Sequence, residues 1–218
     1  IGLKTQWQGS QGRLMFYIGN KSATTDLQAL SMTIPETTGL RISLQPVPAS
    51  VGPKRQIQLM LQVAITSAFV APPNVQFAYQ INNQRCAQSL ALPIRVNKFL
   101  SPMPIASPQE FIAKWHQMAG ASQHQKIMDV SASYANGGTE SVANALNNMR
   151  LTIQKGLDPN PANLVAGSRF VGERCGETLV AARVESDANV RGRYRFTVAS
   201  MDANTSAAVM DTLVAALS

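Results

Sequence analysis

The sequence lacks any long apolar stretch. No run of hydrophobic residues approaches the roughly 20 that an α-helix needs to cross a bilayer, although hydrophobic residues make up 45% of the 218. That share is ordinary for a globular protein and excludes a mainly disordered chain. The chain begins at Ile1 without an initiator methionine or a signal-peptide pattern, so we expect it to be an excised part of a longer protein.

Histidine and cysteine are scarce, with two residues of each. His116 and His124 have no cysteine or cluster of carboxylates beside them, so they form no metal-ligand set. Neither Cys86 nor Cys175 belongs to a CxxC motif, and we expect two reduced thiols, with a disulfide as the alternative. There is no G-x-S-x-G elbow, and no pair of glutamates is spaced for acid–base catalysis. The sequence therefore predicts a protein without enzymatic activity, metal or cofactor.

Acidic residues are scarce in the first hundred positions, where Asp26 and Glu36 stand against nine lysines and arginines. This part carries the whole net charge of +7, whereas residues 101–218 hold ten charged residues of each sign. The basic residues are mostly isolated and few aromatic residues lie between them, which argues against a nucleic-acid surface. An anionic membrane surface stays open as a ligand of the basic part. The change in charge near residue 100 also indicates two domains.

Short segments of alternating polarity fill the first hundred residues. Glycine, proline or asparagine bounds most of them, which is typical of an antiparallel β-sandwich. The expected strands span residues 13–18, 27–34, 40–44, 56–65, 75–79 and 90–96. Residues 1–100 are therefore assigned to a β-sandwich.

The pattern changes after Phe99, and a well-marked helix begins at residue 107. The sequence S-P-Q-E at 107–110 is a capping box, in which Ser107 accepts from the Glu110 amide and Glu110 reaches back to the Ser107 amide. The apolar residues that follow share one helical face: Phe111, Ile112, Trp115 and Met118.

The rest of the second part mixes helices and strands. Helices are expected at 123–130, at 139–149 and at the C-terminal end, and strands at 164–170, 178–185 and 193–200. Residues 101–218 therefore predict an α+β domain.

One octapeptide, D-P-N-P-A-N-L-V at 158–165, is highly specific. Shorter matches follow the same order and spacing along the chain, at 1–4, 12–13, 19–21, 74–77, 92–94, 97–99, 107–115, 183–185 and 194–198. On these segments the chain resembles the appendage (ear) of alpha-adaptin, the large subunit of the plasma-membrane clathrin adaptor. The resemblance implies an Ig-like antiparallel β-sandwich joined to an α/β platform, an antiparallel sheet with flanking helices.

The resemblance also implies a function and partners. The family has no enzymatic activity and binds short motifs of endocytic accessory proteins, with DPF, DPW and FxDxF peptides on the platform and WxxF-type peptides on the sandwich. The ear would be monomeric and joined by a flexible hinge to the remainder of the heterotetrameric adaptor complex. It would act in the cytoplasm, peripherally at the plasma membrane, in the clathrin coat of coated pits.

The platform site implied by the resemblance lies around Trp115. A DPF-type peptide offers a ring and a carboxylate, so its receptor needs an aromatic shelf and a cation on rigid elements. Trp115 matches the family's shelf tryptophan, although its spacing alone is more often that of a core residue. Ile112 replaces a second aromatic residue, which removes an edge-to-face contact of about 1 kcal/mol.

The matching cations of the platform site are Arg183 and Arg195. Glu185 lies two residues after Arg183 and so on the same face of its strand. An acidic residue of the family, located after the tryptophan, falls near His124. The two arginines suit a peptide carboxylate because a guanidinium group binds it bidentately.

Two departures from the family pattern leave an alternative open. Ala199 stands where the family has a further arginine, which should weaken or narrow motif binding unless Arg191 or Arg193 compensates. Together with Ile112, this change favours an ear that has lost or altered its motif specificity and serves other contacts of the coat.

The sandwich site implied by the resemblance involves Gly2, Lys4, Tyr17 and Gly19. Tyr17 replaces a phenylalanine and keeps the ring. The family's glutamine at this site falls opposite Lys54, with Gln56 close by, so both are candidates.

Overall fold

The structure, a computed structural model, describes residues 1–118 and 122–218. It divides into two compact units, one of residues 1–66 and 71–94, the other of residues 67–70 and 95–218. Residues 95–100, expected in the sandwich, thus group with the second unit.

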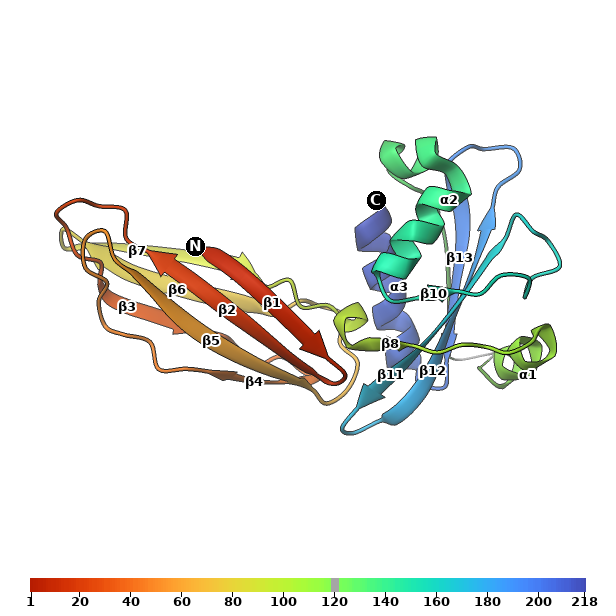
Figure 1. Cartoon of the computed structure of the whole chain (residues 1–218), viewed down its shortest axis with the longest axis horizontal. Helices are drawn as coiled ribbons and strands as arrows, with labels where there is room; N and C mark the ends of the chain where they lie inside the picture. Colours follow the sequence, from red (N-terminus) through yellow and green to blue (C-terminus); the bar gives the residue numbers. More distant parts are fainter. Residues whose placement is uncertain (119–121) are drawn as a thin grey trace. The chain divides into compact units, whose positions relative to one another are not determined.

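The first unit consists of two antiparallel sheets, of four strands in the order β1-β2-β5-β4 and of three in the order β3-β6-β7 (Figure 1). The strands are β1 (Gly2–Gln8), β2 (Gln11–Gly19), β3 (Gln28–Thr33), β4 (Leu40–Leu44), β5 (Gln56–Ile65), β6 (Asn74–Ile81) and β7 (Gln84–Ala91). Alternate residues of β2 and β5 are buried, and Leu14 and Leu61 expose no surface. This alternation is the pattern of a sandwich whose sheets each present one face to a common core.

Two edge strands of the sandwich escaped prediction from the sequence. β1 and β7 pair on one side only and are exposed along nearly all of their length. A strand without a buried face need not alternate in polarity, so the sequence pattern does not predict it. The strand expected at 90–96 was wrong beyond residue 91, because the chain there leads into a 3-10 helix, η1 (Val96–Phe99).

The second unit is a sheet with helices on both faces. Its strands lie in the order β10-β11-β12-β13-β9, with β8 paired to β11. The elements are β8 (Leu100–Pro102), α1 (Pro108–Met118), β9 (Gln123–Asp129), α2 (Ala132–Asn148), β10 (Thr152–Ile153), β11 (Leu164–Gly172), β12 (Gly176–Ser186), β13 (Arg193–Ser200) and α3 (Ala203–Leu217). In Figure 1, α2 and α3 lie on one side of this sheet and α1 lies on the other. The side with α1 is called the α1 face.

One predicted helix is a strand. Residues 123–130, expected to be helical, form β9, which pairs antiparallel with β13 from Gln123 opposite Ala199 to Asp129 opposite Arg193. The pairing partner lies about 70 residues later in the sequence, so the tertiary context decides the conformation and the local pattern does not. The other helices are confirmed, although α2 begins before residue 139 and breaks at Gly138, whose φ of 64° an L side chain rarely adopts.

The capping box at α1 forms with one difference from the expected pattern. The Glu110 amide donates to Ser107 Oγ at 3.1 Å, whereas the Glu110 carboxylate accepts from the Ala106 amide at 2.8 Å and not from that of Ser107. Glu110 also pairs with Lys114 at 2.9 Å, one turn later. Glu110 thus stabilises the first turn of α1 both through its backbone amide and through its carboxylate.

Among the described residues, no helix combines the length and apolar character required to span a membrane.

Asp202 caps α3, the helix that packs against β13 and β9. Its carboxylate accepts from the amides of Asn204 and Thr205 at 3.3 and 3.0 Å. We expect Asp202→Ala to lower the free energy of unfolding of the second unit by about 1 kcal/mol, measured by denaturant titration of the helical circular dichroism signal. Asp202→Asn keeps an accepting oxygen and should stay near wild type. An unchanged midpoint for the alanine variant would contradict the role of this cap.

Candidate functional site

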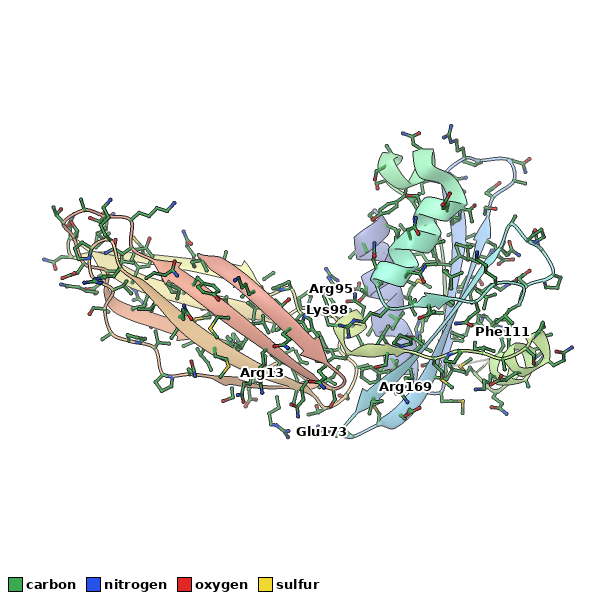
Figure 2. All side chains as sticks on the ribbon, in the orientation of Figure 1. Arg13, Arg95, Lys98, Phe111, Arg169 and Glu173 are labelled. Carbon is green, nitrogen blue, oxygen red and sulfur yellow. The ribbon has the colours of Figure 1, made fainter. Side chains whose placement is uncertain are left out.

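Helix α1 lies on the sheet through Phe111 and Met118, both buried. They form one cluster with Val165 of β11, Ala181 of β12 and Ala199 of β13. Phe111, labelled in Figure 2, is therefore a core residue.

Trp115 lies at the margin of this cluster. It is partly buried, and its ring is tilted by 46° against the Phe111 ring, with centroids 5.4 Å apart. Ile112 on the same helix is 50% exposed. The indole is thus supported from below by the core while part of its surface stays open to solvent.

The strand register places Arg183, Glu185 and Arg195 on the α1 face. Arg183 of β12 is paired with Val165, a member of the cluster under α1, and Glu185 is directly opposite Arg195 of β13. Paired residues point to the same side of a sheet, as do residues two apart in a strand. The sheet therefore brings these three predicted residues together on the face that carries Trp115.

A chain of ion pairs links these residues to Asp158. Arg183 Nε donates to Asp158 Oδ2 at 2.6 Å, and Arg183 Nη1 lies 3.3 Å from Glu185 Oε1. Arg195 Nη1 lies 3.8 Å from Glu185 Oε2. The side chain of Asp158 is only 6% exposed. That of Arg183 is 35% exposed and that of Arg195 is 49% exposed, so Arg195 is the more accessible of the two cations for an incoming carboxylate.

Asp158 is the member of the site that sequence reasoning missed. Its Oδ1 also accepts from the Asn160 amide at 2.9 Å and from Asn163 Nδ2 at 3.1 Å. Burial alone would raise the pKa of Asp158, but the hydrogen bonds from Arg183, Asn160 and Asn163 outweigh it and hold the pKa below its ordinary value. The sequence signal that could have pointed to Asp158 is its position in a loop with two prolines, just before β11.

His124 is not part of this constellation. It is paired with Val198, one residue from Ala199, so its side chain belongs to the opposite face of the sheet. Gln123 is paired with Ala199 and Gln125 with Thr197, and these two residues therefore lie on the α1 face. The structure therefore separates His124 from Trp115 and the two arginines, because residues 123–129 form a strand where the sequence predicted a helix.

The neighbouring arginines are engaged elsewhere. Arg191 donates to the carbonyls of Ala135 and Asn136 in α2, at 3.2 Å each. Arg193 forms a two-bond pair with Asp129, at 2.8 and 3.2 Å. Neither residue replaces an arginine at position 199, where Ala199 is buried under α1.

A hollow of about 220 Å³ adjoins Arg195 further along β13, towards Arg193 and away from the end of the strand that α1 covers. Its lining includes Glu185, Arg193 and Ile127, an exposed apolar residue directly opposite Arg195. An apolar side chain next to a peptide carboxylate would find a contact here.

On the sandwich, the outward face of the β1-β2-β5 sheet collects most of the predicted residues. Gly2 is opposite Tyr17, which lies on the same side as Gly19, and Gly19 is opposite Gln56. Lys4 Nζ lies 5.5 Å from the centre of the Tyr17 ring. A hollow of about 480 Å³ runs along this face, lined by Lys4, Thr5, Gln6, Arg13, Leu14, Met15, Tyr17 and Met60.

Lys54 and Gln56 are separated by the strand start. Gln56 is the first residue of β5 and lies on the outward face, whereas Lys54 precedes the strand with φ 55° and donates its amide to the Ser22 carbonyl at 3.1 Å. The register thus pairs Gln56 with Gly19, on the face that carries Tyr17, whereas Lys54 lies outside the paired strand.

Within the described part of the chain, no three His, Cys, Asp or Glu residues come together as a metal site. Cys86 and Cys175 are free thiols. The two faces described above present aromatic rings, amides and charged groups.

Comparison with known proteins identifies the family of each unit. Residues 1–99 match the family described as adaptin C-terminal domain, and residues 98–217 match the family described as alpha adaptin AP2, C-terminal domain.

Relatives of the chain are subunits of a larger complex. The chain is 35% identical over 202 residues to AP-2 complex subunit alpha-2 of Arabidopsis thaliana and 34% identical to subunit alpha-1 of the same plant, with 93% of this chain and 20% of each relative covered. AP-2 complex subunit alpha-2 of Dictyostelium discoideum is 28% identical over 219 residues, with 100% of this chain and 22% of the relative covered. The chain spans about a fifth of the length of these relatives.

Solved structures similar to part of the chain are GAE domains. That of yeast GGA1 has a TM-score of 0.35 and 16% identity, with 42% of this chain and 88% of that chain covered. That of GGA2p from Saccharomyces cerevisiae has a TM-score of 0.37 and 12% identity, with 42% and 84% covered.

The two family matches together cover both units from residue 1 to residue 217. The chain belongs to the alpha-adaptin family as its C-terminal appendage, a non-catalytic protein-interaction module.

Proposed function

We propose that this appendage recruits endocytic accessory proteins by binding short aromatic–acidic motifs, of the DPF, DPW and FxDxF types, on the α1 face of the platform. The observation that carries this proposal is the partly open Trp115 ring on a rigid helix, on the same sheet face as Arg183 and the half-exposed Arg195. A peptide ring would stack on the indole and the neighbouring Ile112, and the peptide carboxylate would pair with guanidinium groups.

Such a site binds weakly. One anchor ring and one ion pair, less the cost of ordering a flexible peptide, give a Kd of about 1–100 μM. Useful strength comes from avidity, because many motifs on one partner meet many appendages on one coat. This is the arrangement expected of a monomeric ear that is joined by a flexible hinge to the remainder of the heterotetrameric adaptor and acts in clathrin-coated pits at the plasma membrane.

The sandwich would bind a second class of peptide. Its outward face offers the Tyr17 ring, with Gly2 on the neighbouring strand leaving one side of that ring uncovered. The Gln56 amide and the Lys4 ammonium group stand on the same face. We propose this surface as the site for WxxF-type motifs.

A second candidate function is an appendage with altered motif specificity that serves other contacts of the coat. The burial of Ala199 under α1 favours it, because the platform lacks a guanidinium group there. A flat titration with all of the motif types above would favour this alternative.

Trp115→Ala should weaken binding of a DPF or FxDxF peptide about thirtyfold, since truncating a central aromatic anchor costs about 2 kcal/mol. Isothermal calorimetry with the whole chain measures it. Val190→Ala, a change at an exposed apolar residue in the loop between β12 and β13, is the matched control and should leave the Kd unchanged. Saturable binding that survives Trp115→Ala would move the site elsewhere.

Ile112→Phe should strengthen binding of the same peptides about two- to fivefold. The residue is exposed beside Trp115, so a ring fits there without repacking the core and adds an aromatic contact of up to about 1 kcal/mol. Calorimetry and a thermal melt of the variant check affinity and folding together. A weaker complex from a fully folded variant would place the peptide ring away from this part of α1.

Tyr17→Ala should abolish binding of a WxxF-type peptide and leave the platform peptide unaffected. Gly2→Leu should act in the same direction, because a Cβ at residue 2 would lie 3.5 Å from Tyr17 Cβ, an ordinary contact, and the leucine side chain would cover the ring. NMR titration of both variants with both peptides measures the effects. Unchanged WxxF binding in both variants would remove the ligand from this face.

A further inference from the structure

We propose that Glu185 determines the specificity of the platform site by occupying, within the protein, the position that the carboxylate of a bound peptide would take. This inference deepens the proposed function of the α1 face and rests on it. It concerns why the site would discriminate among acidic ligands and why it would bind them weakly.

The geometry places Glu185 between the two arginines of the site. Its Oε1 lies 3.3 Å from Arg183 Nη1 and its Oε2 lies 3.8 Å from Arg195 Nη1, so each carboxylate oxygen faces one guanidinium group. A peptide carboxylate that is to bridge both arginines needs these same donors. Glu185 and such a ligand therefore compete for one position.

Asp158 fixes one side of this arrangement. The Oδ2 atom of its buried carboxylate accepts a hydrogen bond from Arg183 Nε, and its Oδ1 atom accepts from the Asn160 amide and from Asn163 Nδ2. Arg183 is thus oriented by a contact that a solvent-exposed ligand does not reach. Among the described residues Arg195 has no comparable carboxylate contact, and its 3.8 Å separation from Glu185 exceeds hydrogen-bond length. Displacing Glu185 from Arg195 accordingly costs little.

The charges of these four side chains balance. Arg183 and Arg195 stand against Asp158 and Glu185, so the site has no excess positive charge while Glu185 is in place. When Glu185 rotates towards solvent, the arginines face the ligand. A peptide with a well-placed carboxylate gains this contact, and a peptide without one leaves Glu185 where it is.

The test compares Glu185→Gln with wild type in calorimetric titrations of two peptides, one with a DPF triplet and one with NPF in its place. The matched control is Glu177→Gln, which removes one negative charge from the same strand, about 26 Å away at 3.3 Å per residue, where Glu177 pairs with Arg169. We expect Glu185→Gln to bind the DPF peptide about two- to fivefold more tightly, because ion pairs between partly exposed groups are weak. The NPF peptide and the Glu177→Gln variant should show no change.

Glu185→Gln could bind the DPF peptide with unchanged or lower affinity while Trp115→Ala loses affinity for it. This result would overturn the role of Glu185 and leave the proposed function standing. If no variant binds either peptide, the proposed function fails and a second measurement decides the role of Glu185. In that measurement the Arg195 Nε–H resonance is followed by NMR during titration with sodium acetate against sodium chloride. Half-saturation at lower acetate in Glu185→Gln than in wild type supports the competition, and equal curves contradict it.

Discussion

Phe111 and Met118 hold α1 on the sheet, and what the platform offers to a ligand depends on this contact. Residues at this spacing share a helical face, so burying these two brings Trp115 down to the margin of the same cluster. The indole is then rigid, because the Phe111 ring supports it, and it is still partly open. A helix of 11 residues covers only part of the sheet, and the uncovered remainder carries the arginines.

Among the described helices none packs over the remainder of the α1 face, and charged side chains occupy it instead. Arg183, Glu185, Arg195 and Asp158 satisfy one another in a partly exposed setting, where each pair contributes little free energy. A surface of this kind exchanges partners easily. That suits the proposed function, in which the site would meet many short motifs in turn and gain strength from their number.

The sequence predicted the class of both units and most of their strands, because residues such as Leu40, Ile42 and Leu44 alternate with polar, exposed neighbours. It failed where burial is absent or pairing is distant. β1 and β7 are exposed edges without an apolar period, and β9 owes its conformation to β13. The site followed the same division: Arg183, Glu185 and Arg195 could be placed on one face by counting residues in strands, whereas His124 could not be placed without the register of β9. Asp158 could not be assigned to Arg183, since their contact depends on how the loop before β11 folds back.

The outward face of the sandwich has a consequence of its own for how the two surfaces respond to their surroundings. In the rows around Tyr17 it presents mainly glutamine amides and methionine side chains, with Lys4 as the charge beside the ring. Contacts to uncharged amides contain no ion pair for salt to screen, whereas a peptide carboxylate on the platform arginines would form one. A rise in ionic strength would therefore weaken a carboxylate's ion pairs with the platform arginines more than contacts made to the Tyr17 ring and the glutamine amides of the sandwich.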